Sequence, residues 1–273
     1  MHIRYGKKLT IGIGAWGTGL LLFWAGIALF GGIVAPHAAD AYVGKAFLPP
    51  DATHWLGTND VGQDIASQLL AGARTSLLVA LGAAFGSALL GALLGAGGAL
   101  AGGWMERLTA RLMDVGLVIP PVLAAMLAAA YLQPGLPMLV AILAFFFWPA
   151  TGRLLRAQTL LLRESGPATA ARTFGAGKWY VLRRHILPDL APVLSAAMIH
   201  DARRAVFLEA GLAFLGISDP TSPSWGRMIQ QALAFTYLDV WRWWLLPPGF
   251  AVSSLVLAFA LIGSGLEETD VTD

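Results

Sequence analysis

The sequence predicts an all-α membrane protein with six transmembrane helices. Hydrophobic residues make up 57% of the 273-residue chain and charged residues only 12%, whereas a soluble domain has roughly 25% charged residues. The mean hydropathy of +0.67 agrees with this class. Ten Trp and 32 Gly also fit it, since Trp gathers at membrane interfaces and Gly lets membrane helices approach closely.

Six apolar runs are long enough, or nearly long enough, to cross about 30 Å of hydrocarbon, which takes roughly 20 residues of helix. The first run is longer than the core of a signal peptide, so we expect an uncleaved anchor. The fourth is short, but its TGRLL flank extends it and the Arg153 side chain can reach the interface. The predicted spans are residues 11–34, 75–102, 110–132, 137–151, 190–215 and 243–264.

The second span carries small residues at four-residue spacing, at Gly82 and Gly86 and again at Gly91 and Gly95. This spacing lets one helix backbone lie against another, which predicts a helix inside a bundle. A loosely packed, flexible helix is the alternative.

Lys and Arg set the orientation, because they accumulate in short cytoplasmic loops. Six crossings put both termini on one side. Twelve basic residues fall on the side of the N-terminus and four on the other. We therefore expect both termini, and the basic loop of residues 152–189, to lie in the cytoplasm.

Two outer segments are too long to be simple turns. The first covers about residues 35–74, where Asp64 to Ala73 is expected to form an amphipathic interfacial helix. The second covers residues 216–242 and contains a short helix from Trp225. Either segment can face a soluble partner or cover a cavity.

The basic loop has its own helix start and stop. Pro167 fits the first turn of a helix, Ser165 or Gly166 can cap it, and Gly175 supplies a left-handed end. The predicted helix, Pro167 to Phe174, presents a low surface of alanines that suits a groove in a partner. Arg172 and later basic residues are expected to pair with carboxylates of that partner.

The fifth span contains several ionisable residues. A charged group at the centre of a membrane helix costs roughly 2.5–3.5 kcal/mol, so these residues are expected to face one another or water. They form either a polar lining for a substrate path or a buried ion pair or contact with a partner subunit. The residues are His200, Asp201, Arg203, Arg204 and Glu209.

The sequence lacks the motifs of nucleic-acid binding, thiol chemistry, nucleotide binding and hydrolysis. The net charge of +2 and the absence of long basic runs argue against nucleic acid, and a chain with no Cys has no disulfide or thiolate site. A GxGxxG spacing at Gly12–Gly17 lies in a membrane span without a preceding strand, and no phosphate-binding loop surrounds Lys178. No hydrolase motif appears, the His residues are scattered, and His200 lacks further ligands for a metal. We predict no catalytic residues and no metal site.

The basic loop resembles the EAA loop of permease subunits of ATP-binding-cassette (ABC) importers. The resemblance rests on Ala170 and Ala171, on Gly175, and on the HILP sequence ending at Pro188. In that family the loop helix seats in a cleft of the ATPase. The acidic residue that names the loop is replaced by Thr169.

Two further blocks resemble the dipeptide, oligopeptide and nickel permeases of that family. HWLGTNDVGQDIASQLLAGARTSLLVAL covers His54 to Leu81, with Gln63 where Arg is usual, and EAGLAFLGISDPTSPSWGRMI covers Glu209 to Ile229. The three blocks occur in the family's order over about residues 45–266. The resemblance implies the second, C-type permease with a type I importer fold.

The resemblance also implies a multi-pass protein of a bacterial inner membrane, and it implies how the protein works. It implies a heterodimer with a homologous permease, two cytoplasmic ATPase subunits that use ATP and Mg²⁺, and an outer solute-binding protein, while this chain binds no cofactor and is no enzyme. The transported solute would be a peptide, nickel or a metal chelate. The implied ATPase-coupling residues are Ala170, Ala171, Arg172, Phe174, Gly175 and Ala176.

The expected organisation has three parts. Residues 1–74 hold the anchor helix and outer segment, residues 75–266 the permease core with the basic loop (152–189) and outer loop (216–242), and residues 267–273 a short acidic cytoplasmic tail. The main alternative is an ion-coupled secondary transporter, in which the charges of the fifth span would be coupling sites and no ATPase would be needed. An intramembrane enzyme would need a paired acid or nucleophile set, which the sequence does not show.

Overall fold

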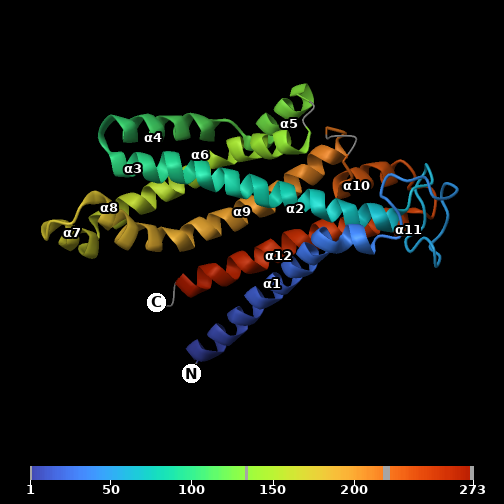
Figure 1. Ribbon diagram of the computed structural model, residues 1–273, viewed down its shortest axis with the longest axis horizontal. Coiled ribbons are helices and arrows are strands. Elements are labelled where there is room, and N and C mark those ends of the chain that lie inside the picture. Colours follow the sequence, from blue (N-terminus) through green and yellow to red (C-terminus); the bar gives the residue numbers. More distant parts are fainter. Residues whose placement is uncertain (1, 133–134, 218–221, 271–273) are drawn as a thin grey trace. The chain divides into compact units, whose positions relative to one another are not determined.

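The computed structural model describes residues 2–132, 135–217 and 222–270, and most of them are helical (Figure 1). Within these ranges no strand forms, and only two isolated β-bridges occur, both in the first outer segment. In chain order the elements are α1 (His2–Val34), α2 (Ile65–Leu90), the π-helical η1 (Gly91–Ala96), α3 (Gly97–Ala101), α4 (Gly103–Val118), α5 (Pro121–Leu132), α6 (Leu136–Glu164), α7 (Gly166–Thr173), α8 (Lys178–Val181), the π-helical η2 (Leu182–Ile186), α9 (Leu187–Phe214), α10 (Trp225–Leu233), α11 (Trp241–Trp244) and α12 (Leu246–Asp270).

Four stretches of the described chain are long and apolar enough to cross a membrane: Gly14–Val34, Ile65–Ala101, Leu136–Glu164 and Trp241–Leu266. The pair α4 and α5 makes a fifth if it counts as one span bent by 79°. The bend follows from Pro120, because the residue before a proline avoids the helical conformation and Ile119 is extended. The fifth predicted span, residues 190–215, corresponds to the 28-residue α9, which carries charged residues near its centre. The all-α membrane fold is confirmed, and six spans are compatible with these elements.

Two predicted boundaries are wrong. The segment from Asp64 to Ala73 is no separate interfacial helix, because α2 begins at Ile65 and runs through it, with Ile65 and Ala73 fully buried. The fourth span is much longer than residues 137–151, since α6 continues to Glu164. Burial against neighbouring elements extends both helices beyond the apolar run that the sequence shows.

The described chain forms two compact units. One unit contains residues 1–81, 126–139 and 202–273, and the other contains residues 82–125 and 140–201. This division follows contacts in space, so the three-part organisation expected along the sequence remains a prediction.

In the first unit α1 packs along α12. A Cβ atom added at Gly17 would lie 2.8 Å from the Ala258 carbonyl oxygen, so the two backbones nearly touch. The Trp24 Nε1 donates a hydrogen bond of 2.9 Å to Ser254 Oγ, and its ring meets the buried Trp225 edge-on. Because α1 is helical through the GxGxxG spacing, that motif forms no dinucleotide site, as expected.

In the second unit the glycines of the second span face α6. A Cβ atom added at Gly82, Gly86, Gly91 or Gly95 would lie within 3.0 Å of an α6 atom. The closest approach is 2.1 Å, from Gly95 to the carbonyl oxygen of Gly152. The prediction of close helix packing is confirmed, and the flexible alternative is not supported.

Several sequence predictions concern residues outside the described set. Residues 218–221 of the second outer loop and residues 271–273 of the acidic tail are not described, and neither are the side chains of Arg4, Lys7, Lys8 and Lys178.

Candidate functional site

The basic loop forms a short helix with a defined end. Helix α7 (Gly166–Thr173) starts after Ser165, whose hydroxyl donates to the Leu162 carbonyl instead of capping α7. At the other end Gly175 has φ +85°, and the amides of Gly175 and Ala176 donate to the carbonyls of Arg172 and Ala171. These paired bonds make a Schellman motif, which needs a left-handed residue and therefore favours glycine. The predicted helix and its glycine stop are confirmed.

One face of α7 is anchored. Ala168 is fully buried in an apolar cluster with Leu155, Val181, Ile186 and Leu190, and Ala171 and Ala176 pack against the same cluster. All of these residues belong to the second unit. The alanine face of the helix therefore packs directly on the apolar cluster.

The opposite face of α7 is open. Ala170 is exposed, and Phe174 is 90% exposed at the end of the helix. Trp179 and Tyr180 are exposed as well. Exposed aromatic side chains on a short, rigid element are typical of a surface that binds a protein partner.

Arg163 and Arg172 donate hydrogen bonds to backbone carbonyls of their own unit. The Arg172 guanidinium donates to the carbonyls of Ala168 and Arg163, and Arg163 donates to the Ala99 carbonyl at 2.8 Å. A hollow of about 680 Å³ opens beside them, lined in part by Trp179. These bonds hold Arg172 against α7, and its expected pairing with a partner's carboxylates remains a prediction. Arg172 is nevertheless exposed, as are Arg183 and Arg184.

Ionisable residues of α9 differ in their surroundings. Asp201 is 2% exposed and accepts hydrogen bonds of 2.7 Å from the hydroxyls of Ser87 and Thr151, all within the second unit. Glu209 is equally buried in the first unit, where Ser76 donates to it at 3.3 Å. Both acids thus meet hydroxyl groups of their own unit.

The remaining three ionisable residues of α9 are less buried. His200 is exposed, and Arg203 and Arg204 are half-buried. Within the described residues His200 joins no group of potential metal ligands. The assignment of all five residues to a substrate path remains a prediction.

Replacing Asp201 by alanine should destabilise the second unit. The change removes the acceptor shared by two buried hydroxyls, which keep only a bond of 3.3 Å between themselves. The loss of these buried hydrogen bonds should cost about 2–3 kcal/mol. Asp201→Asn should cost less, because the amide keeps one carbonyl oxygen. Thermal unfolding of the purified protein in detergent measures both variants. An alanine variant as stable as the parent would mean that these bonds contribute nothing.

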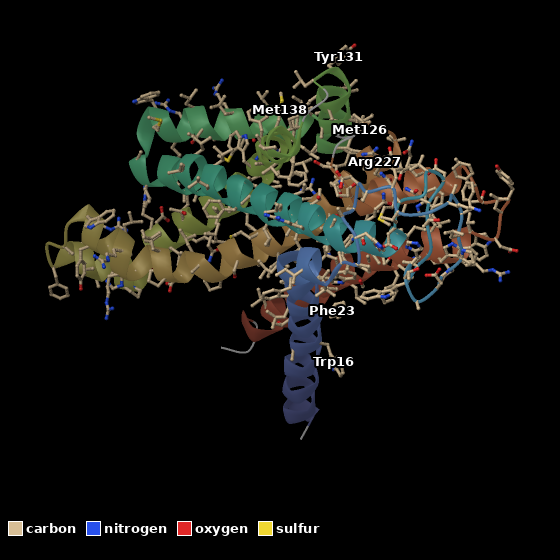
Figure 2. All side chains as sticks on the ribbon, turned by 45° about the vertical axis from the view of Figure 1, so that its right-hand side comes forward. Trp16, Phe23, Met126, Tyr131, Met138 and Arg227 are labelled. Atoms are coloured by element: carbon tan, nitrogen blue, oxygen red, sulfur yellow. The ribbon has the colours of Figure 1, made fainter. Side chains whose placement is uncertain are left out.

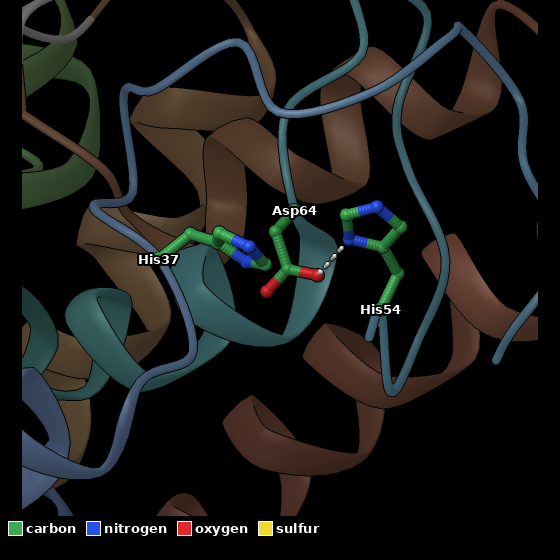
Figure 3. A group of neighbouring side chains, drawn as sticks. All are labelled: His37, His54 and Asp64. Atoms are coloured by element: carbon green, nitrogen blue, oxygen red, sulfur yellow. Dashed lines mark ion pairs between the residues drawn. The ribbon is translucent and has the colours of Figure 1, made fainter. Parts of the chain in front are cut away.

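The first outer segment brings together three residues that the sequence leaves apart. His37, His54 and Asp64 offer ligand atoms that all lie within 4.8 Å of one another (Figure 3). This corrects the expectation that the His residues are scattered. Intervals of 17 and 10 residues follow no metal-binding spacing, so no sequence signal could have revealed the cluster.

The chain was compared with known proteins. The sequence model of the family described as "Binding-protein-dependent transport system inner membrane component" matches residues 87–268, which is more than half of the chain. The chain belongs to this permease family. The basic loop and α9 both fall inside the matched range, whereas His37, His54 and Asp64 precede it.

Named relatives resemble the permease over most of its length. It is 37% identical to a protein of Brucella suis biovar 1 named as a peptide permease, over 80% of this chain and 73% of the relative. It is 34% identical to the D,D-dipeptide transport system permease protein DdpC of Escherichia coli K12, over 85% and 77%. It is also 34% identical to the glutathione transport system permease protein GsiD of Escherichia coli O1:K1, over 89% and 80%.

The permease is therefore a multi-pass inner-membrane component of an ABC importer. This finding favours the ABC importer over the ion-coupled secondary transporter. It also agrees with a chain that transports and does not catalyse.

Proposed function

We propose that the permease couples ATP hydrolysis by partner subunits to alternating access of a solute path, and that α7 is the element that transmits the motion. The observation that carries this proposal is the two-sided nature of α7. Its inner face is anchored on the apolar cluster around Ala168, and its outer face presents Ala170 and Phe174. When a partner subunit moves α7, the movement would be transmitted to α6 and α9, because both helices pack on α7 through this cluster.

The partners follow from this mechanism. The permease would pair with a homologous permease, with two cytoplasmic ATPase subunits and with an outer solute-binding protein. ATP and Mg²⁺ would bind to the ATPase subunits, and the permease itself would bind neither. The coupling residues would be the set predicted from the sequence, with the outward Ala170, Phe174 and Gly175 as the contact surface and Arg172 as an internal brace.

The solute is proposed to be a peptide. The relatives of the permease carry names that specify peptides, D,D-dipeptides and glutathione. Nickel and metal chelates remain the other candidates that the sequence resemblance implies. Arg203 and Arg204, half-buried on α9, would suit a solute that carries a carboxylate.

A bulky residue at position 170 tests the coupling surface. Ala170→Trp should prevent α7 from seating in a partner groove, and the ATPase subunits should no longer co-purify with the permease. Ala52→Trp is the matched control, because Ala52 is also exposed but lies in the first outer segment. Equal ATPase recovery with both variants would contradict the proposed coupling role of α7.

The orientation is tested by labelling single cysteines, which the cysteine-free chain makes simple. Thr173→Cys on α7 should react with a membrane-impermeant maleimide only when the reagent reaches the cytoplasmic side. Ala52→Cys should react only from outside. Labelling of position 173 in intact cells would exclude the proposed topology and with it the contact between α7 and an ATPase.

A further inference from the structure

The cluster of His37, His54 and Asp64 joins three separate points of the first outer segment. His37 follows the end of α1, His54 lies in the middle of the segment, and Asp64 directly precedes α2. Figure 3 shows the two imidazole rings on either side of the Asp64 carboxylate. All three residues belong to the first unit.

Three polar atoms of this cluster are buried and make no hydrogen bond within the described chain. Asp64 is fully buried and His54 is 7% exposed. His37 Nδ1, His54 Nδ1 and Asp64 Oδ1 have no hydrogen-bond partner among the described residues. His54 Nδ1 and Asp64 Oδ1 face each other as an ion pair, but neither atom makes a hydrogen bond to a described residue. A buried polar atom without a hydrogen bond costs free energy, so three of them side by side require a physical reason.

The spacing suits a metal ion. His54 Nδ1 and Asp64 Oδ1 are 3.4 Å apart, which exceeds a good hydrogen bond. Two ligands of a tetrahedral zinc ion, at bond lengths of about 2.0–2.1 Å, lie roughly 3.3–3.4 Å from each other. The third donor, from His37, lies within 4.8 Å of both.

The surroundings orient the carboxylate. Asp64 Oδ2 accepts hydrogen bonds from the Ser67 amide at 2.8 Å and from the Ser67 hydroxyl at 2.6 Å, which leaves Oδ1 turned toward the imidazoles. The Ser67 hydroxyl also accepts the His37 amide at 3.2 Å. Ser67 thus fixes two of the three residues, as the supporting groups of metal sites do.

We propose that His37, His54 and Asp64 bind a divalent transition-metal ion of the zinc type. Two imidazole nitrogens and one carboxylate oxygen form a ligand set that such ions favour over Mg²⁺ or Ca²⁺. The ion compensates the buried charge of Asp64 and gives a ligand bond to these three residues, each of which has a buried atom that makes no hydrogen bond within the described chain. The half-buried His37 leaves a fourth position that water or a donor atom of a solute can fill.

The bound ion would clamp the outer segment. It would link the end of α1 and the loop at His54 to the first turn of α2, adding to the loop hydrogen bonds and aromatic contacts that already hold this segment. This inference uses no residue of the basic loop, so it stands or falls independently of the proposed coupling function.

The test measures zinc bound by the assembled, detergent-purified transporter after treatment with a chelator and titration with Zn²⁺. We expect one ion per permease that is retained by the parent and bound at least tenfold more weakly by His54→Gln and Asp64→Asn. Asparagine can still cap α2, so Asp64→Asn should remain folded. Ser67→Ala should weaken binding about 10- to 100-fold without removing a ligand.

Two further variants complete the test. His185→Gln removes a histidine outside the cluster and should bind zinc like the parent, which controls for sites elsewhere in the assembly. His37→Gln changes the least buried ligand, so it is the variant least prone to misfolding. If the other ligand variants do not fold, its zinc affinity alone tests the proposal. The proposal is overturned if the parent retains no zinc, or if His37→Gln and the other folded ligand variants retain as much as the parent. In that case the cluster is a His54–Asp64 ion pair only.

Discussion

Phe174→Ala should reduce ATP-driven uptake at least tenfold while leaving the permease folded. The Phe174 side chain is 90% exposed at the end of α7, so it contributes little to the stability of the free protein. Aromatic residues at the centre of a protein interface often contribute about 2 kcal/mol or more, roughly thirtyfold in affinity. The loss should therefore appear in ATPase binding, measured by titrating ATPase subunits onto the reconstituted permease pair, and in uptake by the same vesicles.

Trp16→Ala supplies the matched control for this experiment. Trp16 is 79% exposed and points away from α1 far along the chain from the basic loop (Figure 2). Its loss should leave ATPase affinity unchanged, and both variants should keep the unfolding temperature of the parent. Normal ATPase affinity and uptake in Phe174→Ala would show that the exposed end of α7 is not the contact surface.

Gly95→Ala should destabilise the second unit severely. The added Cβ would lie 2.1 Å from the Gly152 carbonyl oxygen and 2.8 Å from its Cα, and both are backbone atoms of α6. A flexible side chain could turn aside, but a backbone moves only if the two helices separate. We expect a loss of about 3 kcal/mol or more, above the usual range for overpacking. Protein yield in the membrane and the unfolding temperature in detergent should both fall.

The control for this substitution lies two residues away. A Cβ at Gly97 would find its nearest neighbour, the Ala92 carbonyl oxygen, at an ordinary 3.7 Å. Gly97→Ala should therefore be neutral or stabilise the helix by about 0.5–1 kcal/mol, since alanine restricts the unfolded chain. Equal stability of the two variants would contradict the tight contact between the second span and α6.

Most of the fold was predictable from the sequence because apolar runs are local features. Runs of about 20 residues or more identified α1, α2 and α12, a shorter run identified α6, and the glycine spacing correctly predicted close packing of the second span. The helix ends were less predictable. The start of α2 at Ile65 and the end of α6 at Glu164 lie beyond the apolar runs, since burial and tertiary contacts decide where a helix stops.

The candidate site was predictable in outline only. Proline and glycine placed α7 within a residue of its observed ends, because turn and cap chemistry depends on neighbouring residues. The direction of its side chains was not predictable. Ala168 faces inward, and Arg172 turns back onto carbonyls of its own loop, because the apolar cluster and the Arg163 carbonyl lie there.

By itself the sequence determined the membrane class, the helical elements, the short helix of the basic loop and the blocks that resemble one permease family. Each of these depends on residues close together along the chain. Only the tertiary structure decided that Asp201 meets a hydroxyl 114 residues away, that α7 exposes Phe174, and that two histidines and an aspartate converge before α2. Such meetings depend on how helices pack and how the outer segment closes, and no local spacing encodes them.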